Sequence, residues 1–130
     1  MQMCFLPKDL SFLRAGGRVS NAAALIGSVL SIHPVIELKD GYLAAGNRLR
    51  GKMQRILPEF IKEFVDIKRM DKEIIWLEYT TGLSEELRVI AEETVQKLGF
   101  QTIHWISAGG VITTHGGPGV FAIAGYSTLL

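Results

Sequence analysis

Residues 32–43 read IHPVIELKDGYL, and they indicate two β-strands joined by a tight turn. Ile32 to Leu38 is an apolar stretch typical of a strand. Asp40-Gly41 follows and leads into Tyr42-Leu43; this dipeptide favours a two-residue turn, because both central residues of such a turn need a positive φ. The stretch therefore predicts a hairpin, and at least one pair of strands in this chain is expected to be antiparallel.

The rest of the chain alternates helical and strand-like patterns. Helical periodicity begins at Met53 and again after Ser84, and strand-like runs occupy 74–79, 101–106, 111–114 and 120–126. The run 74–79 is almost continuously apolar, so we expect it to be covered on both faces. Strands that alternate with amphipathic helices are typical of an α/β sandwich. With the hairpin included, the predicted fold class is α/β, a mixed β-sheet with helices packed on it.

Two helices have clear local signals. The first places its apolar residues on one face, at Met53, Ile56, Leu57, Phe60, Ile61 and Phe64. Pro58 is acceptable there only in the first turn, and otherwise a kink is expected near Leu57. In the second, Ser84 is the predicted N-cap, and Glu85 and Glu86 occupy the first turn, where the helix dipole favours acidic residues.

Two further helices are predicted near the N-terminus, over 7–15 and 22–31. The first ends at Gly16-Gly17, and Ser20 or Asn21 can cap the second. The helix over 22–31 is apolar almost all round, which is typical of a helix inside a core or beneath a second layer of protein.

Composition limits the class of protein. A chain of 130 residues with 48% apolar residues is expected to form a single domain over residues 1–130. The net charge of +1 predicts no general attraction to nucleic acid or to an anionic membrane. Cys4 is the single cysteine, which excludes an internal disulfide framework. With no signal-peptide pattern and no apolar run of about 20 residues, a cytoplasmic protein without stable membrane insertion is expected.

Residues 107–119 read SAGGVITTHGGPG, the most unusual stretch of the chain. Glycines that flank a polar side chain such as His115 let backbone N–H groups and that side chain approach a ligand closely. An ordinary tight turn, with His115 as a capping or solvated residue, explains the pattern equally well. Both interpretations remain open from the residues alone.

Several kinds of site are disfavoured by spacing. The glycines are not followed by the lysine of a P-loop, no G-x-G-x-x-G opens a helix, and no nucleophile elbow of esterase type is present. His33, His104 and His115 lack paired metal-ligand spacing, and His104 is expected to be a hydrogen-bonded residue of the sheet. No metal and no cofactor are therefore predicted.

A basic patch is predicted over residues 48–55. Arg48, Arg50, Lys52 and Arg55 stand there without an acidic residue between them. Such a patch can dock a partner or an anionic group, although a short basic cluster can equally be solvated surface. Arg18, beside the Gly16-Gly17 turn, raises the same two possibilities.

Five pieces of sequence, taken in order, resemble the C-terminal half of the DegV family of bacterial fatty-acid-binding proteins, which are FakB-like. They are GGRVS at 16–20 with leucines at 10 and 13, AAALIG at 22–27, IHPVI at 32–36 with Asp40-Gly41, NRLRG at 47–51, and GVITTHGGPG at 110–119. The resemblance covers about residues 5 to 126. Arg48 stands where the family commonly has a lysine, and His33 replaces the lysine of its Ile-Lys-Pro-Ile piece.

The resemblance implies a non-catalytic lipid-binding subunit of a fatty acid kinase system. A long-chain fatty acid would lie between two lobes, and its carboxylate would be presented to a separate fatty acid kinase subunit. His115, with Thr114 and Gly117, would bind the carboxylate together with hydroxyl groups from the N-terminal lobe. A carboxylate removed from bulk water needs such donors. Arg18 and Arg50 match family arginines associated with the kinase encounter or the acyl-phosphate head.

Two other functions remain as alternatives. One is a phosphate- or nucleotide-binding module built from the glycine-rich turn 109–119 and the basic patch 48–55. The other is a pure interaction domain, which would respond to no small molecule.

The resemblance also changes the expectation drawn from length. The chain matches the C-terminal lobe of a two-domain protein, so an N-terminal lobe is expected to be missing. Alone, the domain would hold fatty acid poorly, or bury an exposed apolar face in a dimer.

Overall fold

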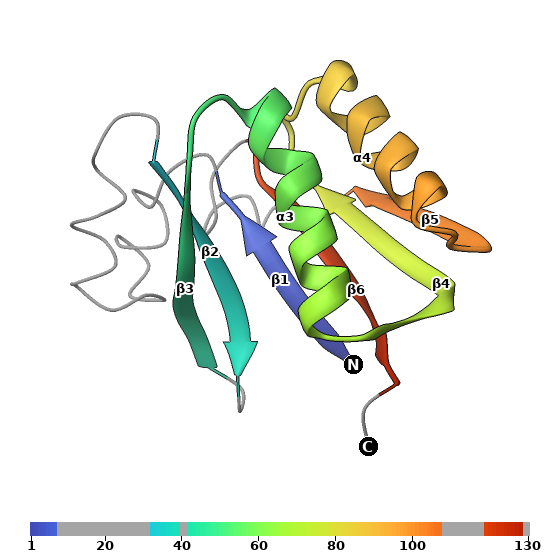
Figure 1. Cartoon of the computed structure of the whole chain (residues 1–130). Helices are drawn as coiled ribbons and strands as arrows, with labels where there is room; N and C mark the ends of the chain where they lie inside the picture. The colour runs from blue at the N-terminus through green and yellow to red at the C-terminus, as the bar shows by residue number, and fades with distance from the viewer. Residues whose placement is uncertain (8–31, 40–41, 108–118, 129–130) are drawn as a thin grey trace.

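The computed structural model describes residues 1–7, 32–39, 42–107 and 119–128. Six strands form one sheet in the order β3-β2-β1-β6-β4-β5, and helices α3 and α4 lie on one of its faces (Figure 1). The strands are β1 (Gln2–Leu6), β2 (Ile32–Lys39), β3 (Tyr42–Arg50), β4 (Met70–Tyr79), β5 (Thr102–Ser107) and β6 (Phe121–Ser127). The helices are α3 (Met53–Ile67) and α4 (Glu85–Lys97).

The predicted mixed sheet is confirmed. Strands β4 and β5 pair in parallel, and the other pairings between the described strands are antiparallel. The parallel pair is joined through α4, which supplies the crossover that parallel neighbours need. The α/β fold class is therefore correct.

The predicted hairpin is present as β2 and β3. Lys39 pairs with Tyr42, so the connection has the predicted length of two residues, and those two, 40–41, lie outside the described residues. The register shifts between Pro34 and Ile36. A proline has no N–H to give to a ladder, and an irregularity of this kind is where a strand accommodates one.

Strand β1 was not predicted. Gln2–Leu6 lies inside the sheet between β2 and β6. Leu6 is fully buried, and it pairs with Phe121 of β6. Five residues show too little alternation to be recognised as a strand, and it is the pairing on both sides that stabilises the segment.

Helix α3 confirms the predicted amphipathic pattern. Its buried residues are Ile56, Leu57, Phe60, Ile61, Phe64 and Val65. Pro58 is the sixth residue of the helix and lies beyond the first turn, and the helix continues through it to Ile67. Pro58 cannot donate the backbone hydrogen bond of that position, so packing of the apolar face offsets the loss.

Helix α4 begins as predicted. The Ser84 hydroxyl oxygen accepts a hydrogen bond from the Leu87 N–H at 3.2 Å, and Glu85 and Glu86 occupy the first turn. The Glu92 carboxylate of this helix accepts a hydrogen bond from the Trp105 indole N–H at 3.2 Å, which ties α4 to β5. Helices α3 and α4 also pack against each other.

The main core lies between the helices and the sheet, but part of the opposite face is buried too. Cys4 and Leu6 belong to the cluster beneath the helices, so Phe5, between them, faces the other way. Its ladder partners Ile36 and Ala122 share that opposite face and are almost completely buried.

The expectation that the run 74–79 is covered on both faces is wrong for the described residues. Ile75 and Leu77 are fully buried, whereas Ile74 and Trp76, on the opposite face, are only half-buried. Every second residue of the run is buried, whereas the apolar run predicted burial on both faces. The alternation arises because both helices pack on one face of this strand.

Several predictions lie outside the described residues. They are the two helices within 8–31, the strand 111–114 and most of the glycine-rich turn 109–119.

Candidate functional site

One predicted site residue, Arg50, is placed by the structure. It is exposed at the end of β3, where its Cα pairs with that of Ile32. Arg18, Thr114, His115 and Gly117 lie in segments 8–31 and 108–118, outside the described residues.

The described residues that flank these two segments all lie at the same end of the strands. We call this end, formed by Leu6, Tyr79 and Ser107, one edge of the sheet. Segment 8–31 follows β1 at Pro7 and precedes β2 at Ile32, while segment 108–118 follows β5 at Ser107 and precedes Gly119. The ladder connects these ends: Leu6 pairs with Phe121, Phe121 with Tyr79, and Tyr79 with Ser107. Arg50 lies at the same edge, next to the start of α3 (Figure 1).

Gly119 and Val120, which follow the glycine-rich segment, are fixed by backbone hydrogen bonds. Gly119 takes a φ of 76°, a conformation that glycine adopts without steric cost, and its N–H donates to the Thr81 carbonyl at 3.0 Å. The Val120 N–H donates to the Thr80 hydroxyl at 2.9 Å, and Thr80 is almost completely buried. This end of the segment is thus fixed at the carboxyl end of β4, where ligands of α/β sheets commonly bind.

Glu78 lies just inside this edge and was not singled out from the sequence. Its Cα pairs with those of Ile106 and Ala122, so its neighbours on the sheet are apolar. Burial of the carboxyl raises the pKa of Glu78 above its ordinary value. The available sequence signal is a single acid inside the apolar run 74–79, and its partial burial depends on the neighbouring strands.

The basic patch is confirmed as a cluster of exposed side chains. Arg48 and Arg50 end β3, Lys52 is the N-cap residue of α3, and Arg55 lies in its first turn. The Arg55 guanidinium donates to the Arg50 carbonyl, and Gly51 between them takes a φ of 126°. The first turn of α3 holds no acidic residue, so cations surround the positive end of a helix dipole. An anion near this point would be stabilised.

His104 lies in the sheet, as expected, and its predicted side-chain hydrogen bond stays a prediction. It is exposed on β5, which forms one edge of the described sheet. Its ring stacks on Trp76 with 6.3 Å between centroids and 22° between planes. Among the described residues, no group of three or more His, Cys, Asp or Glu side chains is arranged to hold a metal ion.

None of the described helices has both the length and the apolar character needed to cross a membrane.

Comparison with protein families gives a match over residues 1–128, to a family described as uncharacterised proteins of the DegV family. A curated relative, a DegV domain-containing protein of Deinococcus radiodurans, is 32% identical over 122 residues, which are 92% of this chain and 42% of the relative. The chain thus spans less than half the length of this relative.

Solved structures give the same fold. A DegV family protein from Thermus thermophilus, described by its fatty acid binding, has a TM-score of 0.76 and 28% identity, over 96% of this chain and 45% of that one. The fatty acid kinase B3 protein of Streptococcus pneumoniae, solved with linoleic acid, has a TM-score of 0.79 and 16% identity. That match covers 97% of this chain and 44% of the pneumococcal one, and at this identity it shows the fold alone.

Proposed function

Because the chain belongs to the DegV family, we propose that it is the C-terminal lobe of a fatty-acid-binding carrier that presents the acyl carboxylate to a separate kinase. The observation that carries the proposal is the 28% identity, over 96% of the chain, with the Thermus thermophilus protein described by its fatty acid binding. The proposed lobe itself has no catalytic role.

The carboxylate site is assigned to the sheet edge where the described residues that flank both segments lie. His115, Thr114 and Gly117 belong to the segment between Ser107 and Gly119, whose flanking residues lie at this edge. A carboxylate held there is stabilised by an imidazole N–H, a hydroxyl and backbone N–H groups, since each removes part of its desolvation cost. Hydroxyl groups from an N-terminal lobe would complete the site.

The acyl chain is assigned to the face of the sheet opposite α3 and α4. The helix-side core is filled by large side chains such as Phe60, Phe64 and Phe121. The opposite face presents small alanines at 122 and 124, both almost completely buried, beside the half-buried Trp76. This face adjoins the edge assigned to the carboxylate.

Mass spectrometry of the full-length parent protein, in which an N-terminal lobe completes the site, tests fatty acid binding directly. The expected result is co-purified long-chain fatty acid, or uptake of added oleate with a rise in melting temperature, because a ligand that binds only the folded state stabilises it. His115→Ala should weaken oleate binding several-fold, and Gln96→Ala, at an exposed position of α4 on the other face of the sheet, serves as the control. A His115→Ala variant that binds oleate as tightly as the original chain would remove the role given to this residue.

The kinase encounter is assigned to Arg18 and Arg50. Arg50 is exposed and belongs to the basic patch, so charge reversal is expected to disturb a partner contact more than the fold. Arg50→Glu should lower acyl-phosphate formation by a purified fatty acid kinase at least tenfold, with oleate affinity unchanged. Equal loss of oleate affinity would instead assign Arg50 to the ligand site.

A phosphate- or nucleotide-binding module remains the second candidate, favoured by the cations at the start of α3. Thermal shift separates the two functions. Stabilisation by ATP or inorganic phosphate, without stabilisation by oleate, would replace the carrier function with this one.

A further inference from the structure

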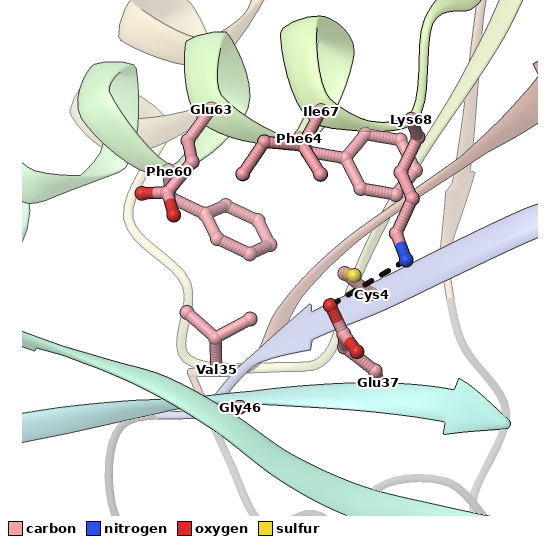
Figure 2. Close-up of a pocket in the computed structure, with 9 residues that line it drawn as sticks. All are labelled: Cys4, Val35, Glu37, Gly46, Phe60, Glu63, Phe64, Ile67 and Lys68. Carbon is pink, nitrogen blue, oxygen red and sulfur yellow. Dashed lines mark ion pairs between the residues drawn. The ribbon is translucent and has the colours of Figure 1, made fainter.

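Arg88, near the start of α4, has no hydrogen-bonding or ion-pair partner among the residues that the structure describes. The Nε–H of its guanidinium is buried and donates no hydrogen bond. Lys68, at the end of α3, shows the usual arrangement, because its ammonium lies 3.7 Å from the Glu37 carboxylate (Figure 2). A buried N–H without an acceptor costs free energy and is uncommon in native proteins, so Arg88 is a candidate for binding an anion.

The acidic side chains nearest in the helix leave the Arg88 guanidinium unpaired. Glu85 precedes it by three positions and Glu92 follows it by four, the spacings at which helical side chains meet. Glu92 instead accepts the Trp105 indole N–H, while Glu85 and Glu86 are exposed. Water screens charges at exposed positions. The charge of the guanidinium is therefore left for an external anion.

The Arg88 side chain reaches the edge of the sheet that was assigned to the carboxylate. Its guanidinium carbon lies 4.7 Å from the centre of the Tyr79 ring, a cation–π contact that holds the group in place. Tyr79 belongs to this edge, and it pairs with Ser107, which the glycine-rich segment follows. Side chains of a helix lean toward its N-terminus, which agrees with this direction. The cation is thus held beside the candidate site.

The chain segments that adjoin this edge contain almost no acid. Residues 108–118 have no Asp or Glu, and residues 8–31 have one acid against three basic residues. The basic patch over residues 48–55 adds four more cations near the same edge. By composition alone, these segments favour an anionic group at the edge and offer few carboxylates that could compete for Arg88.

A phosphate group suits this cation better than a carboxylate does. The planar fork of a guanidinium donates to two oxygens at once. A phosphate monoester offers three such oxygens and a charge of about −1.5 to −2 at neutral pH, whereas a carboxylate has a single negative charge. The proposed carrier function supplies the group: a carboxylate oxygen bonds to the terminal phosphorus of a nucleoside triphosphate on the kinase, and the nucleoside diphosphate leaves.

We propose that Arg88 binds the phosphate group of the acyl phosphate at this edge, and so favours the phosphorylated lipid over the fatty acid. This inference rests on the carrier function proposed above. It assigns to Arg88 a preference for one head group, whereas the assigned carboxylate ligands act on the fatty acid itself.

Inorganic phosphate, titrated into this chain at constant ionic strength, tests the site without lipid. The Nε–H resonance of Arg88, followed by NMR, should shift and saturate in the millimolar range, because one forked contact binds weakly. Acetate at the same concentrations should shift it less. No saturable shift with phosphate would overturn the proposal, and this readout needs no variant that might fail to fold.

Two lipids with apolar tails of equal length test the source of the phosphate group in the full-length parent protein. They are tetradecyl phosphate, a stable mimic of an acyl phosphate, and pentadecanoate. Arg88→Gln should weaken tetradecyl phosphate about tenfold, as expected for a lost hydrogen bond to a charged group, and leave pentadecanoate within about twofold. Arg88→Lys keeps the charge without the fork and should recover part of the loss. Lys97→Gln, at an exposed position in the last turn of α4, is the control.

The outcomes separate this proposal from the carrier function. Equal losses for the two lipids, or unchanged binding of tetradecyl phosphate by Arg88→Gln, would overturn the preference for phosphate. Inorganic phosphate that binds at Arg88 while the phosphate lipid does not depend on it would mean that the site takes free phosphate, and the assignment to the lipid would be wrong. A parent protein that binds neither lipid would contradict the carrier function itself.

Discussion

Single side chains fix the boundaries of the elements that shape this fold. At the start of α4, the Ser84 hydroxyl oxygen accepts the Leu87 N–H at 3.2 Å, which satisfies one of the unpaired N–H groups of the first turn. Ser84→Ala should lower the free energy of unfolding by about 1 kcal/mol. Urea unfolding measures the loss. Ser84→Asp, which keeps an acceptor, should recover most of it, and equal losses in both variants would show that capping is not the cause.

Gly51 has a backbone conformation that favours glycine over other residues. Its φ of 126° is rarely adopted by other residues, and a Cβ there would collide with the Arg55 guanidinium. Gly51→Ala should therefore cost about 1–3 kcal/mol of stability and displace Arg55 from the Arg50 carbonyl. Gly46→Ala, in the same strand region but with ordinary contacts, should stay within about 1 kcal/mol of the original chain. Thermal unfolding of both variants makes the comparison, and equal melting temperatures would contradict it.

These residues also show what local sequence can reveal. Ser84 was predicted as an N-cap because the cap and the two acids after it lie within three positions of one another. Glu78 carries no comparable local signal. Its Cα pairs with those of Ile106 and Ala122, which lie beside it only once β5 and β6 have paired with β4.

At the scale of elements, strand β4 places the carboxyl group of Glu78 in a partly buried position. The native pKa of Glu78 lies above the unfolded value of about 4.5, because burial penalises the carboxylate. The protonated form is therefore favoured by folding. Its contribution to stability is fully present below the unfolded pKa and is lost as pH rises through the raised native pKa.

Glu78→Gln tests this contribution. The variant should lose the part of the pH dependence that lies between the unfolded and the raised pKa, and it should be more stable than the original chain at neutral pH. Urea unfolding at a series of pH values from 4 to 7 gives the comparison. Glu73→Gln, at an exposed position of the same strand, is the control for the substitution itself. A Glu78→Gln curve parallel to that of the original chain would contradict the prediction.

Elements with long periodic patterns could be predicted from the sequence. Short elements whose stability depends on distant strands could not. Helix α3 and the β2–β3 hairpin follow from spacing and turn chemistry within their own residues. Strand β1 has five residues, and its stability comes from partners more than thirty positions away in β2 and more than a hundred away in β6. The candidate site has the same limitation. Arg50 was predicted, but its position at one edge with Pro7, Ile32, Ser107 and Gly119 depends on the order of the strands.

At the scale of the whole molecule, the sheet has two halves that differ in pairing. Strands β3, β2 and β1 form an antiparallel meander, and β6, β4 and β5 contain the parallel pair. The halves meet where β1 pairs with β6 along five residue pairs. Phe121 of β6 lies at this junction, with its ring 6.1 Å from that of Phe60 and 6.2 Å from that of Trp105, between centroids.

Phe121→Ala should therefore destabilise both halves together. Removing a fully buried ring costs about 3–5 kcal/mol, a large share of the roughly 5–15 kcal/mol that holds a domain folded. Tryptophan fluorescence follows the β4–β5 half, and amide hydrogen exchange of β2 and β3 follows the other. Both should shift to lower urea by the same amount, whereas Val89→Ala, at a site 48% exposed, should shift neither. If β2 and β3 kept their protection while the tryptophan signal moved, the halves would be separate folding units, and the edge assigned to the fatty-acid carboxylate would join two independently stable parts.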